Sequence, residues 1–250
     1  MTGRLRRAAR RGPRLGLALA CGLWAAGAGP LAQAQTVAQT GACRLALAMA
    51  LDVSSSVDAA EHRLQADGLA DALLDPSVVE ALLAPGPDGY VAIAVYEWSG
   101  RRQQALIADW ALMDGVPAIQ ALAARVRAAP RSHADFPTAL GYALGYGATL
   151  LARAPDCRKR TIDMAGDGKN NDGFEPRHAY RAFNFNGITV NALVVGGTTR
   201  PSLMRYFRDE VLHGPEAFTE VAEDYSDFAR AMRLKLLREV RPALVIGDAR

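Results

Sequence analysis

The stretch Cys43–Ser56, CRLALAMALDVSSS, decides the fold of this chain. An unbroken apolar run over 45–51 ends at Asp52, and the hydroxyl residues Ser54 and Ser56 follow. A run of this kind is typical of a strand buried on both faces in the centre of a parallel sheet. Ligands of open parallel sheets bind just past the carboxyl ends of the strands, where this Asp-x-Ser-x-Ser sequence lies. Its oxygen atoms suit a hard cation such as Mg²⁺ and suit zinc poorly.

Strand and helix patterns alternate through the rest of the chain. Apolar strands are expected at 91–95, 161–165 and 188–195, and amphipathic helices separate most of them. Segment 104–110 follows its neighbour after a turn too short for a crossover, so it is expected to be an antiparallel strand at the sheet edge. The alternation predicts an α/β fold with a doubly wound (Rossmann-like), mostly parallel sheet.

The first 34 residues have the composition of a secretory signal peptide. Six arginines precede the apolar stretch Leu15 to Ala26, and Ala32-Gln33-Ala34 fits a small-x-small cleavage site. The apolar stretch is too short for a membrane anchor. A lipid attachment at Cys21 is disfavoured because Ala18 is a poor residue three positions before it. Both the general secretory and the twin-arginine export routes stay open.

We therefore predict four segments and an exported protein. The segments are a signal peptide at 1–34, a linker at 35–41, one domain at 42–242 and a C-terminal tail at 243–250. The predicted location is the periplasm or the outside of the cell. The full chain carries a net charge of +3, and removing six arginines leaves 3 − 6 = −3. No basic stripe remains to suggest binding to nucleic acid.

Two of the three cysteines remain after this cleavage. Cys43 precedes Asp52 by nine positions, and Cys157 precedes Asp167 by ten. If the two strands are parallel neighbours, the cysteines lie side by side at the opposite end of the sheet, within the ~7 Å between Cα atoms that a disulfide needs. A disulfide is also expected from the exported location, and two free thiols are the less favoured alternative.

A set of oxygen-bearing side chains falls at equivalent places, just after predicted strands or at the opening of a helix. The set consists of Asp52, Ser54 and Ser56 after the first strand, Thr138 before an uncharged helix, and Asp167 after strand 161–165. If the strands before Asp52 and Asp167 are neighbours, the whole set meets at one crevice of the sheet.

This pattern resembles the metal-ion-dependent adhesion site of the von Willebrand factor A-like fold. The stretches that carry the resemblance are ALDVSSSVD, EWSG, PTALGYAL and GDGKNNDG, and it extends from Cys43 to roughly Val240. The chain is identified as similar to a family of uncharacterised exported bacterial proteins of this type. The resemblance implies a six-stranded, mostly parallel sheet with helices on both faces. It also implies metal ligation by the hydroxyls of Ser54, Ser56 and Thr138 and, directly or through water, by Asp52 and Asp167.

Mainly neutral ligands leave Mg²⁺, or Mn²⁺ or Ca²⁺ in its place, electrophilic and able to exchange its waters. An acidic residue of a protein partner can then complete the coordination, which predicts a non-enzymatic, adhesion-type binding module. The Gly-x-Ser-x-Gly, HExxH and P-loop motifs are absent from the sequence. Two alternatives stay open: a metal-assisted hydrolase with His133 or His178 as the base, and a metal-free scaffold.

Other residues are weighed for a role near this site. The candidates for a partner-binding rim are Trp98, His133, Asp135 and Asp172. Packing in the core is an equal alternative for Trp98, and solvated loop positions are an alternative for the two acids. Asp163 lies inside a predicted strand and requires a buried partner that the sequence does not identify.

Overall fold

A computed structural model describes residues 43–84 and 89–241 of the chain. The predicted signal peptide at 1–34, the linker at 35–41 and the tail at 243–250 lie outside the described residues. The sheet has six strands in the order β3-β2-β1-β4-β5-β6. The strands are β1 (Cys43–Asp52), β2 (Tyr90–Trp98), β3 (Gln104–Leu112), β4 (Cys157–Gly166), β5 (Ile188–Val195) and β6 (Thr219–Ala222).

Nine helical segments lie between or after the strands in the described part of the chain. They are α1 (Ala59–Leu74), α2 (Pro76–Leu83), α3 (Val116–Ala128), α4 (Leu140–Ala152), α5 (Pro176–Ala182), α6 (Pro201–Tyr206), the π-helix η1 (Phe207–Val211), the 3₁₀-helix η2 (Tyr225–Asp227) and α7 (Phe228–Val240). Within the described residues, none of these helices combines the length and the apolar character needed to cross a bilayer.

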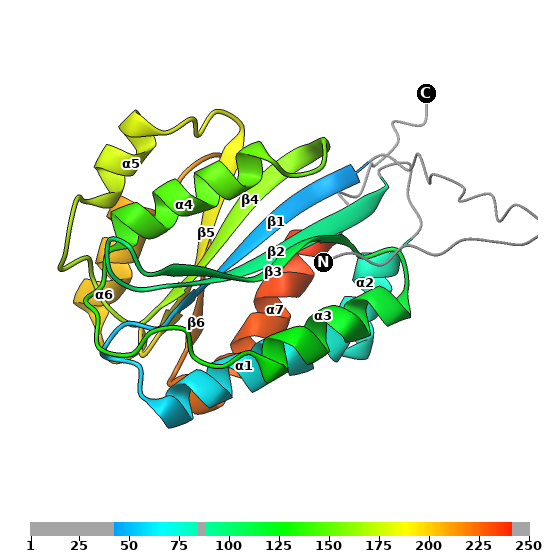
Figure 1. Ribbon diagram of the computed structural model, residues 1–250, viewed down its shortest axis with the longest axis horizontal. Helices are drawn as coiled ribbons and strands as arrows, with labels where there is room; N and C mark the ends of the chain where they lie inside the picture. The colour runs from blue at the N-terminus through cyan, green and yellow to red at the C-terminus, as the bar shows by residue number, and fades with distance from the viewer. Residues whose placement is uncertain (1–42, 85–88, 242–250) are drawn as a thin grey trace, which may run out of the picture. The chain divides into compact units, whose positions relative to one another are not determined.

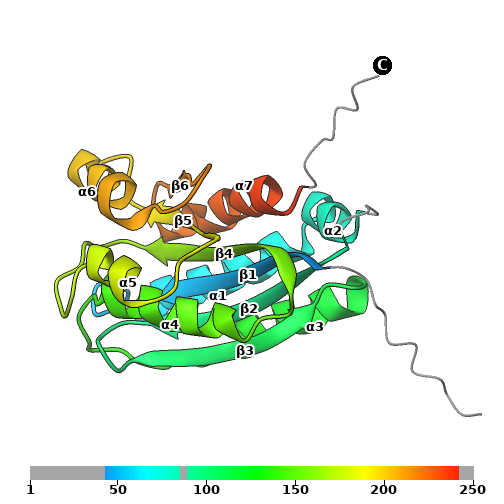
Figure 2. The same ribbon diagram turned by 90° about the horizontal axis from the view of Figure 1, so that it is seen from above.

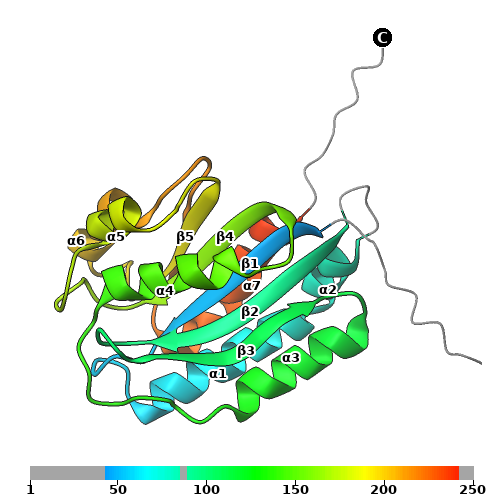
Figure 3. The same ribbon diagram turned by 45° about the horizontal axis from the view of Figure 1, so that its top comes forward.

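Helices cover both faces of the sheet, as Figures 1 and 3 show. Leu47 and Met49 of β1 point to one face, where they pack with α1, α2, α3 and α7. Ala46 and Ala48 point to the other face, which α4, α5 and α6 cover. Side chains alternate between the two faces of a strand, so both faces of β1 must be apolar, and this explains its unbroken run.

The strand order confirms the predicted doubly wound sheet. All neighbouring pairs are parallel except β2 and β3, and β3 and β6 form the two edges (Figure 2). Strand β1 lies between β2 and β4, and its position beside β4 is the one that the spacing of Cys43 and Cys157 predicts. These two cysteines form a disulfide with a Cα–Cα distance of 4.4 Å.

Strand β4 begins four residues earlier than its apolar pattern predicts. Its first four residues are CRKR, and the side chains of Arg158 and Lys159 are exposed where the strand extends beyond the core. Asp163, further along β4, has the buried partner that the sequence left unnamed. The Nζ atom of Lys235 on α7 lies 2.6 Å from its Oδ1, and both side chains are almost completely buried.

Candidate metal centre

The candidate centre begins at Asp52, the last residue of β1, whose side chain is completely buried. The backbone N–H of Ser54 donates to Asp52 Oδ1 at 2.7 Å. Asp52 Oδ2 is buried and has no hydrogen-bond partner within the described part of the chain. An unpaired buried carboxylate oxygen costs free energy, so this atom fits a position that a cation satisfies.

A second carboxylate reaches the same place from β4. Asp167 follows the end of β4, and Ser56 Oγ donates to its Oδ1 at 2.7 Å. Ser54 Oγ and Ser56 Oγ are 3.2 Å apart. The structure therefore brings together the three predicted ligands that end or follow β1 with the one that follows β4. They meet because β1 and β4 are parallel neighbours.

Thr138 is held near them by a network of backbone contacts. Ser55 N–H donates to the carbonyl of Phe136 at 2.8 Å, which ties the loop before α4 to the loop after β1. Thr138 N–H donates to Asn171 Oδ1 at 2.8 Å, and Asn171 N–H donates back to the Thr138 carbonyl at 2.9 Å. A Cβ atom placed on Gly168, next to Asp167, would lie 3.6 Å from Thr138 Oγ1, so the predicted ligands converge from three loops.

The electrostatics of the centre favour a bound cation. Burial, and then the nearby Asp167 carboxylate, raise the pKa of Asp52 to about 7, against hydrogen bonds from Ser54 that lower it. The described residues contain no group of three or more His, Cys, Asp or Glu side chains that could hold a metal ion. A cation at this centre would therefore depend on hydroxyl ligands in addition to the two aspartates. The donor set is thus carboxylate plus hydroxyl, which suits hard divalent cations that retain water.

Several residues that support this centre were not identified from the sequence. Gln65 Nε2 of α1 donates to the Asp52 carbonyl at 2.9 Å, and the Arg200 guanidinium donates to the Asp167 carbonyl at 2.8 Å. Arg131 donates to the carbonyls of Val53 and Ser54 at 3.1 and 3.0 Å. Each contact joins a side chain to backbone far away in the chain, and no local sequence pattern marks such a contact.

Gly166 is a further residue that the sequence analysis missed. A Cβ atom at this position would lie 3.3 Å from Asp52 Oδ2 and 3.5 Å from Trp98 Cζ2. The absence of a side chain leaves room beside the unpaired carboxylate oxygen. The signal in the sequence is the glycine directly before Asp167, at the end of the strand.

The candidate rim is corrected at Trp98, whose side chain is completely buried and so cannot contact a partner. Side chains alternate between the two faces of β2, and the Trp98 ring points into the core on the α4 side. This is the core packing that the sequence left open as an alternative. Asp172 pairs with Arg101 at 2.7 Å, and its backbone N–H donates to the carbonyl of Thr138 at 3.3 Å. Asp135 is exposed.

The two histidines considered as bases are placed differently. His133 is partly exposed; its Nδ1 lies 3.0 Å from Ser132 Oγ, and its ring packs edge-on against Phe136. His178 is exposed on α5. In the described part of the chain, neither histidine forms a hydrogen bond or ion pair with a predicted metal ligand.

Solved structures share this fold at low sequence identity. A von Willebrand factor type A protein from Catenulispora acidiphila matches with a TM-score of 0.57 and 16% identity, over 80% of this chain and 43% of that chain. Proximal thread matrix protein 1 from the mussel byssus, in a structure described as having a zinc-occupied MIDAS motif, matches with a TM-score of 0.51 and 14% identity, over 79% and 48%. The pilus adhesin SpaC from Lactobacillus rhamnosus GG, in its open conformation, matches with a TM-score of 0.55 and 12% identity, over 81% and 31%.

The chain spans less than half the length of these three proteins. No curated protein matches it. A family model described as "Protein of unknown function (DUF1194)" matches residues 42–244. The fold is that of a von Willebrand factor A domain, and the chain belongs to the DUF1194 family of proteins of unknown function.

Proposed function

We propose that the protein is an exported binding module that holds a divalent cation, Mg²⁺ by preference or Mn²⁺ or Ca²⁺, and docks an acidic residue of a protein partner onto it. One observation carries the proposal: the unpaired, buried Oδ2 atom of Asp52 lies in a cluster of hydroxyl and carboxylate oxygens. The proposed ligands are Asp52, Ser54, Ser56, Thr138 and Asp167.

The bound cation would supply an electrophile with exchangeable waters. The buried Asp52 is positioned to hold it together with Ser54, and the exposed Ser56 lies at the side from which a partner can approach. A carboxylate of the partner would displace one water. The function requires no base and no nucleophile from this chain. The known neighbours support the proposal, because they include a pilus adhesin and a matrix protein with a zinc-occupied MIDAS motif.

Exposed groups around the cluster define the surface that a partner would meet. Phe136, which is 38% exposed, follows the exposed Asp135 in the loop that is tied to Ser55. Lys169 is exposed two residues after Asp167. An aromatic ring and a cation beside a metal favour a partner segment with an acidic residue next to an apolar one. We propose that this segment docks in the periplasm or outside the cell, after cleavage near Ala34.

The test is a thermal melt of residues 35–250 with the disulfide formed, first in EDTA and then with Mg²⁺, Mn²⁺ or Ca²⁺. A cation at roughly 100 times its Kd adds about 2.7 kcal/mol to the free energy of unfolding, which a melt resolves. We expect this stabilisation in the wild type and in Asp156→Ala, a control at a fully exposed acid. We expect none in Asp52→Ala.

Equal stabilisation of Asp52→Ala and the wild type would contradict the proposed site. Stabilisation of neither by any cation would favour the metal-free scaffold. If the cation binds, phage-displayed peptides selected in Mg²⁺ and eluted with EDTA test the docking step. Selected peptides should carry Asp or Glu, and replacing that residue by Asn or Gln should abolish binding.

A further inference from the structure

A cavity of about 530 Å³ lies at the opposite end of the sheet from the candidate metal centre. Its walls come from the first residues of β4 and β5, the segment before β6 and the last turn of α7. Thr161 of β4 lines this cavity, and Asp167, which follows the end of β4, lies six residues later in the chain. At about 3.3 Å per residue, six positions correspond to roughly 20 Å, so the cavity is separate from the metal cluster.

Positive charge predominates on the cavity walls. Four basic residues line it, namely Arg158, Lys159, Arg160 and Arg238, against two acidic residues, Glu216 and Glu239. The carboxylate of Glu239 lies 2.7 Å from Lys235 Nζ, an ammonium group that it shares with Asp163. The walls therefore present a net positive potential to a molecule that enters.

Part of this charge is held in a fixed position. The guanidinium of Arg238 lies 3.8 Å from the centre of the Phe218 ring, and Phe218 also lines the cavity. Such stacking orients an arginine without using its hydrogen-bond donors, which stay available for an anion. A guanidinium fork matches the geometry of carboxylate and phosphate oxygens.

Neutral polar groups accompany the charges. Thr161, Thr189 and Asn191 line the cavity. Asn191 is almost completely buried, and its side-chain amide is held between Glu239 and the backbone N–H of Phe218, at 2.8 and 3.1 Å. Pockets of about 300–1,000 Å³ that combine fixed polar groups with apolar walls are typical of small-molecule sites.

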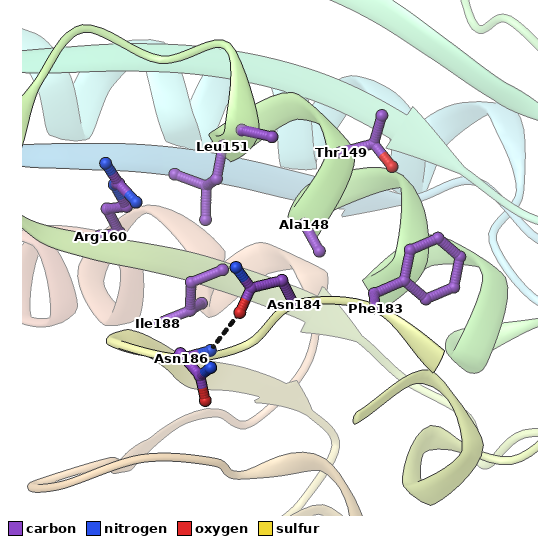
Figure 4. A pocket seen from close by; sticks show the side chains of 9 residues that line it. Ala148, Thr149, Leu151, Arg160, Phe183, Asn184, Asn186 and Ile188 are labelled. Carbon is purple, nitrogen blue, oxygen red and sulfur yellow. Dashed lines mark hydrogen bonds between the residues drawn. The ribbon is translucent and has the colours of Figure 1, made fainter. Parts of the chain in front are cut away.

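Arg160 also lines a second, smaller pocket of about 220 Å³ between α4 and β5 (Figure 4). The other residues of that pocket are apolar or neutral, and two of them, Asn184 and Asn186, are joined by a hydrogen bond of 3.1 Å. Arg160 is its one charged residue among those described. The cationic character is therefore concentrated in the larger cavity.

We infer that the larger cavity is a binding site for a small organic anion with at least two negative charges, held by Arg238, Lys159 and their basic neighbours. Phosphate esters and polycarboxylates share this chemistry. The site is independent of the proposed metal-dependent function, because none of its residues belongs to the metal cluster.

The experiment is isothermal titration of residues 35–250, stripped of metal with EDTA and then dialysed into chelator-free buffer, with inorganic pyrophosphate, citrate and, as an uncharged comparison, glycerol. We expect pyrophosphate or citrate to bind with a Kd below about 1 mM at low ionic strength, and glycerol not to bind. The difference between the two anions identifies which chemical source the site prefers. Binding should weaken as salt is added, because screening reduces the attraction.

Two exposed residues of the cavity provide the variants, Lys159→Gln and Arg238→Gln, singly and together. The matched control is Arg233→Gln, which removes the same charge from α7 outside the cavity. We expect the double variant to weaken binding by about tenfold or more, equivalent to about 1.4 kcal/mol, and the control to change it less than about twofold. No binding of either anion, or equal weakening in the control and the cavity variants, would overturn the inference. Asp52→Ala should leave the anion affinity unchanged.

Discussion

The buried charges between α7 and β4 offer a sharp test of what attaches the last helix to the sheet. Lys235 Nζ lies 2.6 Å from Asp163 Oδ1 and 2.7 Å from Glu239 Oε1. All three side chains are 2% exposed or less, so two carboxylates share one ammonium group out of contact with water. Replacing Lys235 by Met keeps most of the volume and leaves both carboxylates without their cation.

The expected loss follows from the cost of leaving buried charges unpaired. Removing one partner of a buried ion pair destabilises a protein by about 3–5 kcal/mol, a large share of the about 5–15 kcal/mol that stabilises a typical domain. Urea denaturation at pH 7 measures the change from the midpoint and slope of each curve. Arg233→Met is the control, since it removes a partly exposed cation from the same helix and should cost less than about 1 kcal/mol.

The pH dependence adds a second readout. Burial, and then the neighbouring Glu239, raise the pKa of Asp163 to about 7 from its ordinary value of 3.8. The folded state therefore binds this proton more tightly than the unfolded state. The contribution of this group to stability is greatest below about pH 4 and is lost as the pH rises towards 7, by at most about 1.4 kcal/mol per unit.

The variant Asp163→Asn removes this titration and leaves Lys235 paired with Glu239. It should thus gain stability relative to the wild type between pH 5 and pH 7. A loss below about 1 kcal/mol for Lys235→Met would refute the reasoning. So would parallel pH profiles for Asp163→Asn and the wild type.

Three further predictions concern the metal cluster and the disulfide. In EDTA at pH 8, Asp52→Asn should melt at a higher temperature than the wild type, because a folded pKa of about 7 for Asp52 means that its stabilising contribution is lost as the pH rises above the ordinary value of 3.8. A divalent cation should reverse that order, and an unchanged order would contradict metal binding at Asp52. Gly166→Ala places a Cβ atom 3.3 Å from Asp52 Oδ2; we expect calorimetry to show at least about tenfold weaker Mg²⁺ binding, about 1.4 kcal/mol, with an unchanged circular dichroism spectrum. Changing both Cys43 and Cys157 to Ser opens a link between residues 114 positions apart; urea denaturation should show a loss of about 2–5 kcal/mol, and a loss below about 1 kcal/mol would mean that the unfolded chain gains little freedom.

The fold could be predicted because its central signals are local. The apolar run before Asp52 requires burial on both faces, and the short connection after Trp98 permits only an antiparallel neighbour. The matched spacing of the two cysteines predicts that β1 and β4 are neighbours, and the strand pairing and the disulfide confirm it. These three patterns depend on strand geometry alone, so they can be recognised in a single sequence.

The contacts around the site could be predicted only in part. The set of oxygen donors follows from the positions where strands end, but the exposure of each residue does not. Trp98 ends a strand beside Asp52, yet the alternation of side chains directs its ring into the core. The partner of Asp163 also escaped prediction, because Lys235 lies 72 positions away on a helix whose spacing suggests only an amphipathic face.

The distribution of charge along the sheet explains why the two proposed sites have opposite ligands. At the carboxyl ends of β1 and β4, Asp52 and Asp167 repel each other, and the contacts of Arg200 and Arg131 there go to backbone carbonyls. A bound cation would relieve the repulsion between these two carboxylates. At the amino end, the basic start of β4 and Arg238 outweigh the acids of the cavity. One sheet can hold a cation at one end and an anion at the other without conflict, because roughly 20 Å exceeds the Debye length of about 8 Å at physiological salt.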